Sequence, residues 1–262
     1  MLKKFFKSDE WKLFHGLYLA LFVGVSIPDI DMIIMVFFFS KGFSATQIGL
    51  GMAIQSLLII LSEIPTGAVA DIFGKRRSVQ ISWLMQSVIF ALFFFITEPW
   101  MMMTLFALKG IAITFSSGAY ESLPYEIAEK EGRKDLVKKF YSTNEFVYKF
   151  ATALSNLNVI LFLLLVGAET TWHVFGQQHL GLDFLWLTGS VGYFIGTLLL
   201  FRVKEGYSRK DGDSEFIENT AQEVGKISVK AFKYTLTHKV VRKMVLVGIF
   251  MTITTQLFAD IV

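Results

Sequence analysis

The sequence GAVADIFGKRR, residues 67–77, joins a long apolar run to an acid, a glycine and three consecutive cations. The residues before it, from Gln47, and the residues after it, from Val79, are almost free of charged side chains. A short charged connection between two apolar runs is typical of a turn at the edge of a membrane. This stretch therefore predicts two membrane-spanning segments joined by a tight polar turn.

The composition of the whole chain agrees with a membrane location. Hydrophobic residues make up 53% of the 262 positions, 27 residues are phenylalanine, and the mean hydropathy is +0.54. These values lie far above those of water-soluble domains, so we expect the lipid bilayer as a partner. The absence of cysteine excludes disulfides, thiolate metal sites and a cysteine nucleophile. A net charge of +3 gives no reason to expect a nucleic-acid partner.

Seven apolar runs come close to the roughly 20 residues that a helix needs to cross a bilayer. Lipid offers backbone groups no hydrogen-bond partner, and the runs are too continuously apolar for barrel strands, so each is predicted to be a helix. The predicted fold class is an all-α integral membrane protein. The predicted spans are Leu13–Phe39, Gln47–Ala70, Val79–Thr97, Trp100–Tyr120, Phe140–Val166, Phe184–Phe201 and Met244–Val262.

Cationic residues are sorted along the chain. The N-terminus and the second, fourth and sixth connections between spans hold 22 of the 25 Lys and Arg residues. Lys41 lies on the opposite side, while Lys109 and Lys149 lie inside spans. The positive-inside rule places cation-rich connections in the cytoplasm. We therefore expect a multi-pass protein of the cell membrane with a cytoplasmic N-terminus.

The spans and connections divide the chain into three regions. Residues 1–203 form a predicted six-helix bundle, residues 204–240 a charged cytoplasmic linker, and residues 241–262 a seventh transmembrane helix. Apolar residues recur near helical spacing in the linker, which predicts an amphipathic helix on the inner membrane surface. The outside loop, residues 167–183, contains His173 and His179, but two histidines without a third ligand indicate no metal site.

The stretch quoted above fits the pattern G-x-x-x-D-x-x-G-[RK]-[RK]-[RK] and lies in the predicted cytoplasmic turn between the second and third spans. In motif and in location it resembles the major facilitator superfamily of secondary transporters. Glu63–Thr66 and Ser116–Ala119 are similar to segments of many prokaryotic members whose substrates are unassigned. The resemblance implies a six-helix N-terminal half and a missing C-terminal half, of which only the seventh helix is included. The chain is then expected to be a fragment of a longer reading frame or the product of a truncated gene.

The residues of this motif have physical roles that can be stated separately. A glycine at position 67 allows another helix to approach closely, a carboxylate at position 71 can accept from the amides or an arginine at a helix end, and a glycine at position 74 permits a tight turn. The resemblance implies that the acid contacts the second half and latches the outward-open state. Ile72 departs from the family, which usually has a basic residue there, and the simpler alternative is a cytoplasmic anchor alone. The gating candidates are Gly67, Asp71, Gly74, Lys75, Arg76 and Arg77.

Charged residues inside the predicted spans are candidates for substrate and proton binding, because each costs about 2.5–3.5 kcal/mol on insertion scales. Asp29 and Lys109 lie at similar depths near the middle of the bilayer, so a charge pair between them is possible. The resemblance implies that the first and fourth helices line the central cavity. Asp31 points to nearly the opposite side from Asp29, so only one of the two can face that cavity. A carboxylate at this depth could take up and release a proton as its lysine partner moves.

The remaining intramembrane charges have structural alternatives. Glu145 and Lys149 share one face of the fifth span, where they either help to hold the substrate or neutralise each other and join helices. Glu63, beside Pro65, belongs either to the packing around the turn motif or to an ion site.

These observations predict a secondary active transporter that moves a small molecule, with proton coupling, by alternating access. The alternative is a non-transporting fragment of a truncated gene of the same family. An enzyme is not expected, because the sequence contains no metal-ligand set, nucleophile elbow or Walker-type loop. No cofactor is expected.

Overall fold

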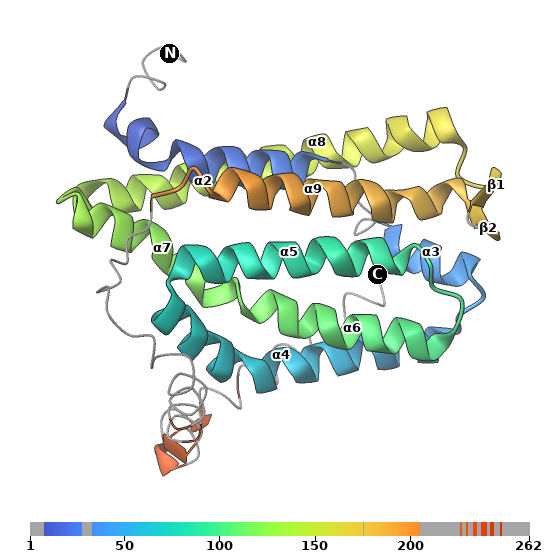
Figure 1. Cartoon of the computed structure of the whole chain (residues 1–262), viewed down its shortest axis with the longest axis horizontal. Helices are drawn as coiled ribbons and strands as arrows, with labels where there is room; N and C mark the ends of the chain where they lie inside the picture. The colour runs from blue at the N-terminus through green and yellow to red at the C-terminus, as the bar shows by residue number, and fades with distance from the viewer. Residues whose placement is uncertain are drawn as a thin grey trace.

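The computed structural model describes residues 8–27, 33–174 and 176–204, together with isolated residues between positions 226 and 247. Long helices run roughly along one axis of the molecule (Figure 1). Most residues of the predicted linker and of the seventh span lie outside the described residues, as do Asp29 and Asp31.

The described part of the chain is mostly helical. Its α-helices are α2 (Asp9–Ser26), α3 (Ile34–Ser40), α4 (Ala45–Phe73), α5 (Lys75–Phe93), α6 (Pro99–Thr114), α7 (Ser117–Lys130), α8 (Val137–Val166) and α9 (Phe184–Leu200). Single 3₁₀ turns, η2 (Lys134–Leu136) and η3 (Gly181–Asp183), precede α8 and α9, and a short hairpin consists of β1 (Thr171–Val174) and β2 (Gln177–Leu180).

Four helical stretches in the described residues are long and apolar enough to cross a membrane. They cover α4, the pair α6 and α7, α8 with η2, and α9 with η3. The coarse prediction of a helical, membrane-type chain is therefore confirmed. Helices α2 and α5 are not among these four stretches. The first turn of α5 consists of three cations and α2 begins with Asp9 and Glu10, so the hydropathy of both helices is lower.

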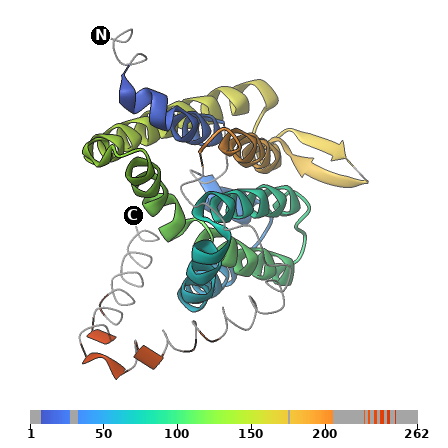
Figure 2. The same cartoon turned by 60° about the vertical axis from the view of Figure 1, so that its left-hand side comes forward.

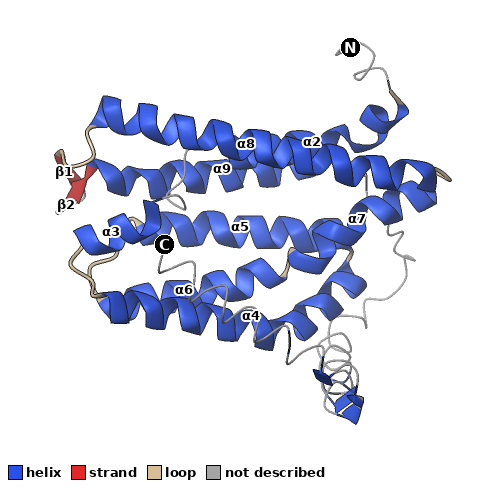
Figure 3. Cartoon of the chain, turned by 180° about the vertical axis from the view of Figure 1, so that it is seen from behind, coloured by secondary structure: helices blue, strands red, loops and turns tan. Residues whose placement is uncertain are grey.

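The helices pair in a regular way. α2 packs against α8 and α9, α4 packs against α6, and α5 packs against α9 and α6. In Figures 1 and 3, α2, α8 and α9 lie along one side and α4, α5 and α6 along the other. In chain order, α2 belongs to the first predicted span, α4 to the second, α5 to the third, α6 and α7 to the fourth, α8 to the fifth and α9 to the sixth. Exchanging spans one, two and three with spans four, five and six then maps the α2–α8 pairing onto α4–α6 and the α2–α9 pairing onto α5–α6, and maps the α5–α9 pairing onto itself.

The two ends of the helices are distinct. We call the end with the α4–α5 turn at Gly74 and the α7–α8 connection the turn end, and the end with the β1–β2 hairpin the hairpin end (Figure 1). The hairpin extends away from the helices in the turned view (Figure 2). Two aromatic-rich cores fill the interior, one around Trp186 near the hairpin end and one around Phe140 near the turn end.

Several boundaries differ from the sequence-based prediction; for example, α5 runs from Lys75 to Phe93 instead of from Val79 to Thr97. The first span is not one continuous helix, because α2 ends at Ser26 and Ile27 is extended, with φ −71° and ψ 136°. Pro28 follows, and a proline disfavours the helical conformation of the residue before it. The fourth span is interrupted between α6 and α7 and continues to Lys130 rather than ending at Tyr120. The outside loop contains a hairpin that the prediction did not include.

Candidate functional site

The turn motif lies where α4 ends and α5 begins. Gly74 is both the C-cap of α4 and the N-cap of α5, with φ 96° and ψ 140°. Its N–H donates to the carbonyl of Ala70. A residue with a Cβ atom adopts this conformation only with strain, so the turn favours glycine at this position. The tight turn predicted at Gly74 is present.

Lys75 and Arg76, which follow this turn, contact parts of the chain that are distant in sequence. Lys75 forms an ion pair with Glu126 of α7, with 2.7 Å between Nζ and Oε1. Arg76 donates from its guanidinium to the carbonyl of Val203, just beyond α9, at 2.8 Å. A cation at this position satisfies a carbonyl that the helix itself leaves without a donor. Arg77 is exposed. The basic triplet therefore connects the start of α5 to α7 and to the end of α9.

A cavity of about 190 Å³ opens beside the motif. Glu63 and Asp71 of α4 contribute carboxylates, and both residues are exposed. The other lining residues are mostly small and come from α4 and from the α6–α7 region: Gly67, Ala70, Thr114, Ser117, Gly118, Ala119 and Ser122, with Lys75 at the edge. The cavity is therefore lined mainly by small side chains and carries two carboxylates.

The walls of this cavity meet at the interruption between α6 and α7. The hydroxyl of Ser117 donates to Glu63 at 2.7 Å, and the hydroxyl of Thr66 donates to the carbonyl of Thr114 at 3.2 Å. From α5, Ser78 donates to the carbonyl of Phe115 at 2.6 Å. The bonds from Thr66 and Ser78 satisfy backbone carbonyls that the interrupted helix leaves open, because regular i to i−4 bonding stops there. The segment Ser116–Ala119 was noted from the sequence, but the bond from Ser117 to Glu63 was not predicted.

Gly67 stands on the open side of the cavity. A Cβ atom added to it would have no described atom within 4 Å. The close helix approach expected at this glycine is therefore not made by the described helices, and it stays a prediction. By contrast, a Cβ on Gly110 of α6 would lie 2.6 Å from the carbonyl of Gln55, so this glycine is where α4 and α6 touch.

Lys109 lies ten residues into α6, about 15 Å from its start at 1.5 Å per residue. That position is near the middle of a hydrocarbon layer about 30 Å thick. The residue is 8% exposed, and its ammonium group lies 5.1 Å from the centroid of the Phe90 ring of α5. The side chain of Lys109 is therefore buried in the helix bundle, where α6 packs against α5. The pairing predicted with Asp29 concerns a residue outside the described ranges and stays a prediction.

Glu145 and Lys149 form the predicted ion pair on α8, with 3.5 Å between their charged atoms. Their side chains are 65% and 70% exposed. The two charges therefore lie close enough to neutralise each other, but both residues belong to α8, so this ion pair does not join α8 to another described helix. Its exposed position leaves it available to a water-filled cavity or to a further protein surface.

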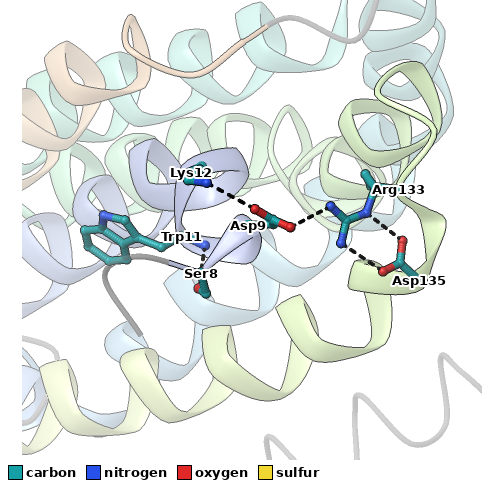
Figure 4. A network of polar contacts seen from close by, with 6 residues as sticks. All are labelled: Ser8, Asp9, Trp11, Lys12, Arg133 and Asp135. Carbon is teal, nitrogen blue, oxygen red and sulfur yellow. Dashed lines mark hydrogen bonds and ion pairs between the residues drawn. The ribbon is translucent and has the colours of Figure 1, made fainter. Parts of the chain in front are cut away.

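The turn end is closed on the α2 side by a polar network. Asp9 accepts from Lys12 at 3.2 Å and from Arg133 at 3.0 Å, and Arg133 also holds both oxygens of Asp135 (Figure 4). These two aspartates have pKa values below their usual range, mainly because Arg133 donates hydrogen bonds to them. The network fixes the start of α2 to the connection between α7 and α8.

A second, buried acid lies beside this network. Glu10 is fully buried and accepts from the hydroxyls of Tyr18 at 2.9 Å and Thr143 at 2.6 Å, and Lys139 lies 2.7 Å away. Burial alone would raise the pKa of Glu10, but the hydrogen bonds from Lys139, Thr143 and Tyr18 outweigh it and lower the pKa. Glu10 is not among the residues predicted from the sequence, because an acid in a first helical turn usually interacts only with the helix end.

The histidines of the outside loop differ in surroundings. His173 is exposed on β1, whereas His179 of β2 is 2% exposed and contacts Asp183. In the part of the chain that the structure describes, no group of three or more His, Asp or Glu side chains could hold a metal ion.

The comparison with protein-family models finds no match for this chain, and the comparison with characterised proteins finds none either. The class defined by the fold is therefore a helical protein whose described residues include four helical stretches long and apolar enough to cross a membrane. An acidic, glycine-walled cavity at its turn end is the candidate functional site.

Proposed function

We propose that the protein is a secondary active transporter of a small molecule, related to the major facilitator superfamily, that works by alternating access with proton coupling. The observation that carries this proposal is the pairing of the helices. Neighbouring spans run in opposite directions, so an exchange of the first three spans with the next three relates two inverted units. Inverted repeats of three helices are a construction principle of secondary transporters, with the substrate bound near the bilayer middle.

The proposed orientation places the turn end in the cytoplasm. The described cations gather there, including Lys75, Arg76 and Arg133, whereas Lys41 stands near the hairpin end. Cytoplasmic connections carry an excess of Lys and Arg. The protein is then a multi-pass protein of the cell membrane with its N-terminus inside.

The turn-end cavity is the proposed gate. Asp71 faces an open space beside Gly67, and nothing from the described helices fills it. A second bundle can bring a helix end against Gly67, where its positive dipole or an arginine meets the carboxylate of Asp71. Forming and releasing this contact would close and open the cytoplasmic side. Lys75, Arg76 and Gly74 hold the turn in the required position through α7 and α9.

The proposed coupling site lies near the middle of the membrane. Lys109 is a buried cation at that depth, and such a charge costs about 2.5–3.5 kcal/mol on insertion scales. A role in transport gives a reason to keep it. We assign proton uptake to Asp29, with Lys109 as its counter-charge, while Asp31, Glu63, Glu145 and Lys149 are secondary candidates for contacts with the substrate or a proton.

Transport is tested in proteoliposomes that contain the protein and a pH-sensitive dye inside. Addition of a transported compound from a library of small metabolites should change the internal pH, because substrate and proton move together. The variants Asp29→Asn and Lys109→Gln should abolish this change, whereas Glu121→Gln, an exposed residue at the turn end, should retain it. Proton movement that persists in Asp29→Asn removes that residue from the mechanism, and no compound-dependent flux across the library contradicts the transporter proposal.

Orientation is tested separately, because the chain contains no cysteine and single cysteines give clean labels. In intact cells, a membrane-impermeant maleimide should label Ala45→Cys at the hairpin end and should leave Arg77→Cys at the turn end unlabelled. The opposite pattern contradicts the proposed gate on the cytoplasmic side.

A further inference from the structure

A buried ion cluster connects separate segments at the hairpin end. Asp183 of η3 is fully buried and forms an ion pair with Lys41, which follows α3. The same carboxylate oxygen accepts from the N–H of Leu180 at 3.1 Å and lies 3.2 Å from Nδ1 of His179. One carboxylate thus joins the α3–α4 turn, the end of β2 and the start of α9.

The imidazole of His179 is enclosed by aromatic rings. It is 2% exposed and stacks on Phe94, at the end of α5, with ring centroids 4.0 Å apart and planes 10° apart. Phe95 presents an edge at 6.4 Å, and Trp172 stands opposite on β1. The charged groups that face the ring are Asp183, which it contacts, and Lys41, which shares the same oxygen of Asp183. Among the described residues Nε2 of the ring has no hydrogen-bond partner.

This arrangement fits the neutral form of the imidazole. With Nδ1–H donating to Asp183, the buried Nε2 carries a lone pair. A proton added to Nε2 would place a donor without an acceptor in an apolar enclosure. It would also give the cluster a net positive charge, because Lys41 already balances Asp183. The cost of burying an unbalanced charge exceeds the gain from placing a cation over one phenyl ring. The ring must therefore leave the enclosure in order to become charged.

We propose that His179 is a proton sensor that holds the hairpin end closed at neutral pH and releases it in acid. In the closed form the buried Nε2 has no acceptor for an added proton, whereas in the open form the exposed ring can bind one. Because the open form binds one proton more than the closed form, a fall in pH moves the equilibrium towards opening. Release frees the hairpin and η3 from Phe94 and loosens the start of α9. This device is independent of transport, and it senses the cell exterior if the proposed orientation is correct.

The release can be measured on the whole chain in lipid vesicles. Leu182, beside Asp183, is 4% exposed, so Leu182→Cys is a buried reporter, and Gln178→Cys on β2 is an exposed reference. The labelling rate of the buried reporter is divided by that of the reference at each pH, which removes the intrinsic pH dependence of the thiol. We expect this ratio to rise at least about threefold between pH 7.5 and 5.5, along a curve for a single titrating group.

Two histidine variants identify the sensor. His179→Asn retains a donor near the position of Nδ1 but cannot be protonated in this range, so its ratio should be the same at both pH values. His173→Asn removes the exposed histidine of the same hairpin and should keep the rise. A ratio independent of pH in the chain with His179 overturns the proposal without reference to any variant. A rise that persists in His179→Asn, or one that disappears in His173→Asn, also overturns it.

Discussion

Gly74 occupies a backbone conformation that other residues adopt only with strain. Its φ of 96° and ψ of 140° allow α4 to end and α5 to begin within one residue. Replacement by alanine is expected to cost about 1–3 kcal/mol in the free energy of unfolding. Thermal and denaturant unfolding in detergent measure the loss. Gly49→Ala in α4 is the matched control, because an added Cβ there has no described atom within 4 Å, and it should not destabilise the protein. An equal loss in both variants would contradict the role of backbone conformation.

Glu10 gives a prediction about pH. Its lowered pKa means that the folded protein favours the charged carboxylate more than the unfolded chain does. Its contribution to stability is therefore complete above about pH 4.3, the ordinary value for glutamate, and is lost as the pH falls through the lowered pKa. At neutral pH, Glu10→Gln should lower the free energy of unfolding by about 1–3 kcal/mol, and this difference should shrink towards pH 3. Glu121→Gln, on the exposed surface of α7, is the control and should show little effect at either pH. A difference for Glu10→Gln that is constant with pH would contradict this account.

At the scale of the elements, the interruption between α6 and α7 depends on donors from other helices. Ser78 is fully buried and donates to the carbonyl of Phe115. Ser78→Ala leaves that carbonyl without this donor and should lower the free energy of unfolding by about 1–3 kcal/mol, the penalty for an unsatisfied buried group. Ser122→Ala is the matched control, since the hydroxyl of Ser122 bonds within α7, to the carbonyl of Gly118, and its loss should cost less. Chemical unfolding of both variants measures the difference.

The helices show which features a sequence can predict. Long apolar runs predicted α4, α8 and α9 to within a few residues, because a helix is the structure that satisfies its own backbone in lipid. The interruption of the fourth span was missed, although the signal was present. Ser116 and Ser117 bond back to the carbonyls of Ile113 and Thr114, and such side-chain bonds compete with the regular helix.

Only those features of the candidate site that depend on local sequence were predictable. The turn at Gly74 follows from the local sequence, since it needs only a glycine between two helices. The partners of the charged residues do not follow from local sequence. Lys75 with Glu126 and Lys41 with Asp183 are joined across long chain distances, so only the packing of the helices brings them together. The depth of Lys109 was predictable, but its burial against Phe90 was not.

At the scale of the whole molecule, the open side of the turn-end cavity distinguishes a packed gate from a simple anchor. Gly67 has free space around it in the described helices, so Gly67→Leu should leave their thermal unfolding unchanged. If a second bundle closes against Gly67, the leucine side chain blocks that contact, and transport of the compound found in the flux screen should fall by about tenfold or more, which corresponds to about 1.4 kcal/mol. Gly49→Leu, also without a described atom within 4 Å and on the same helix, should change neither quantity. Transport at the original rate in Gly67→Leu would show that the motif anchors the turn without forming a gate.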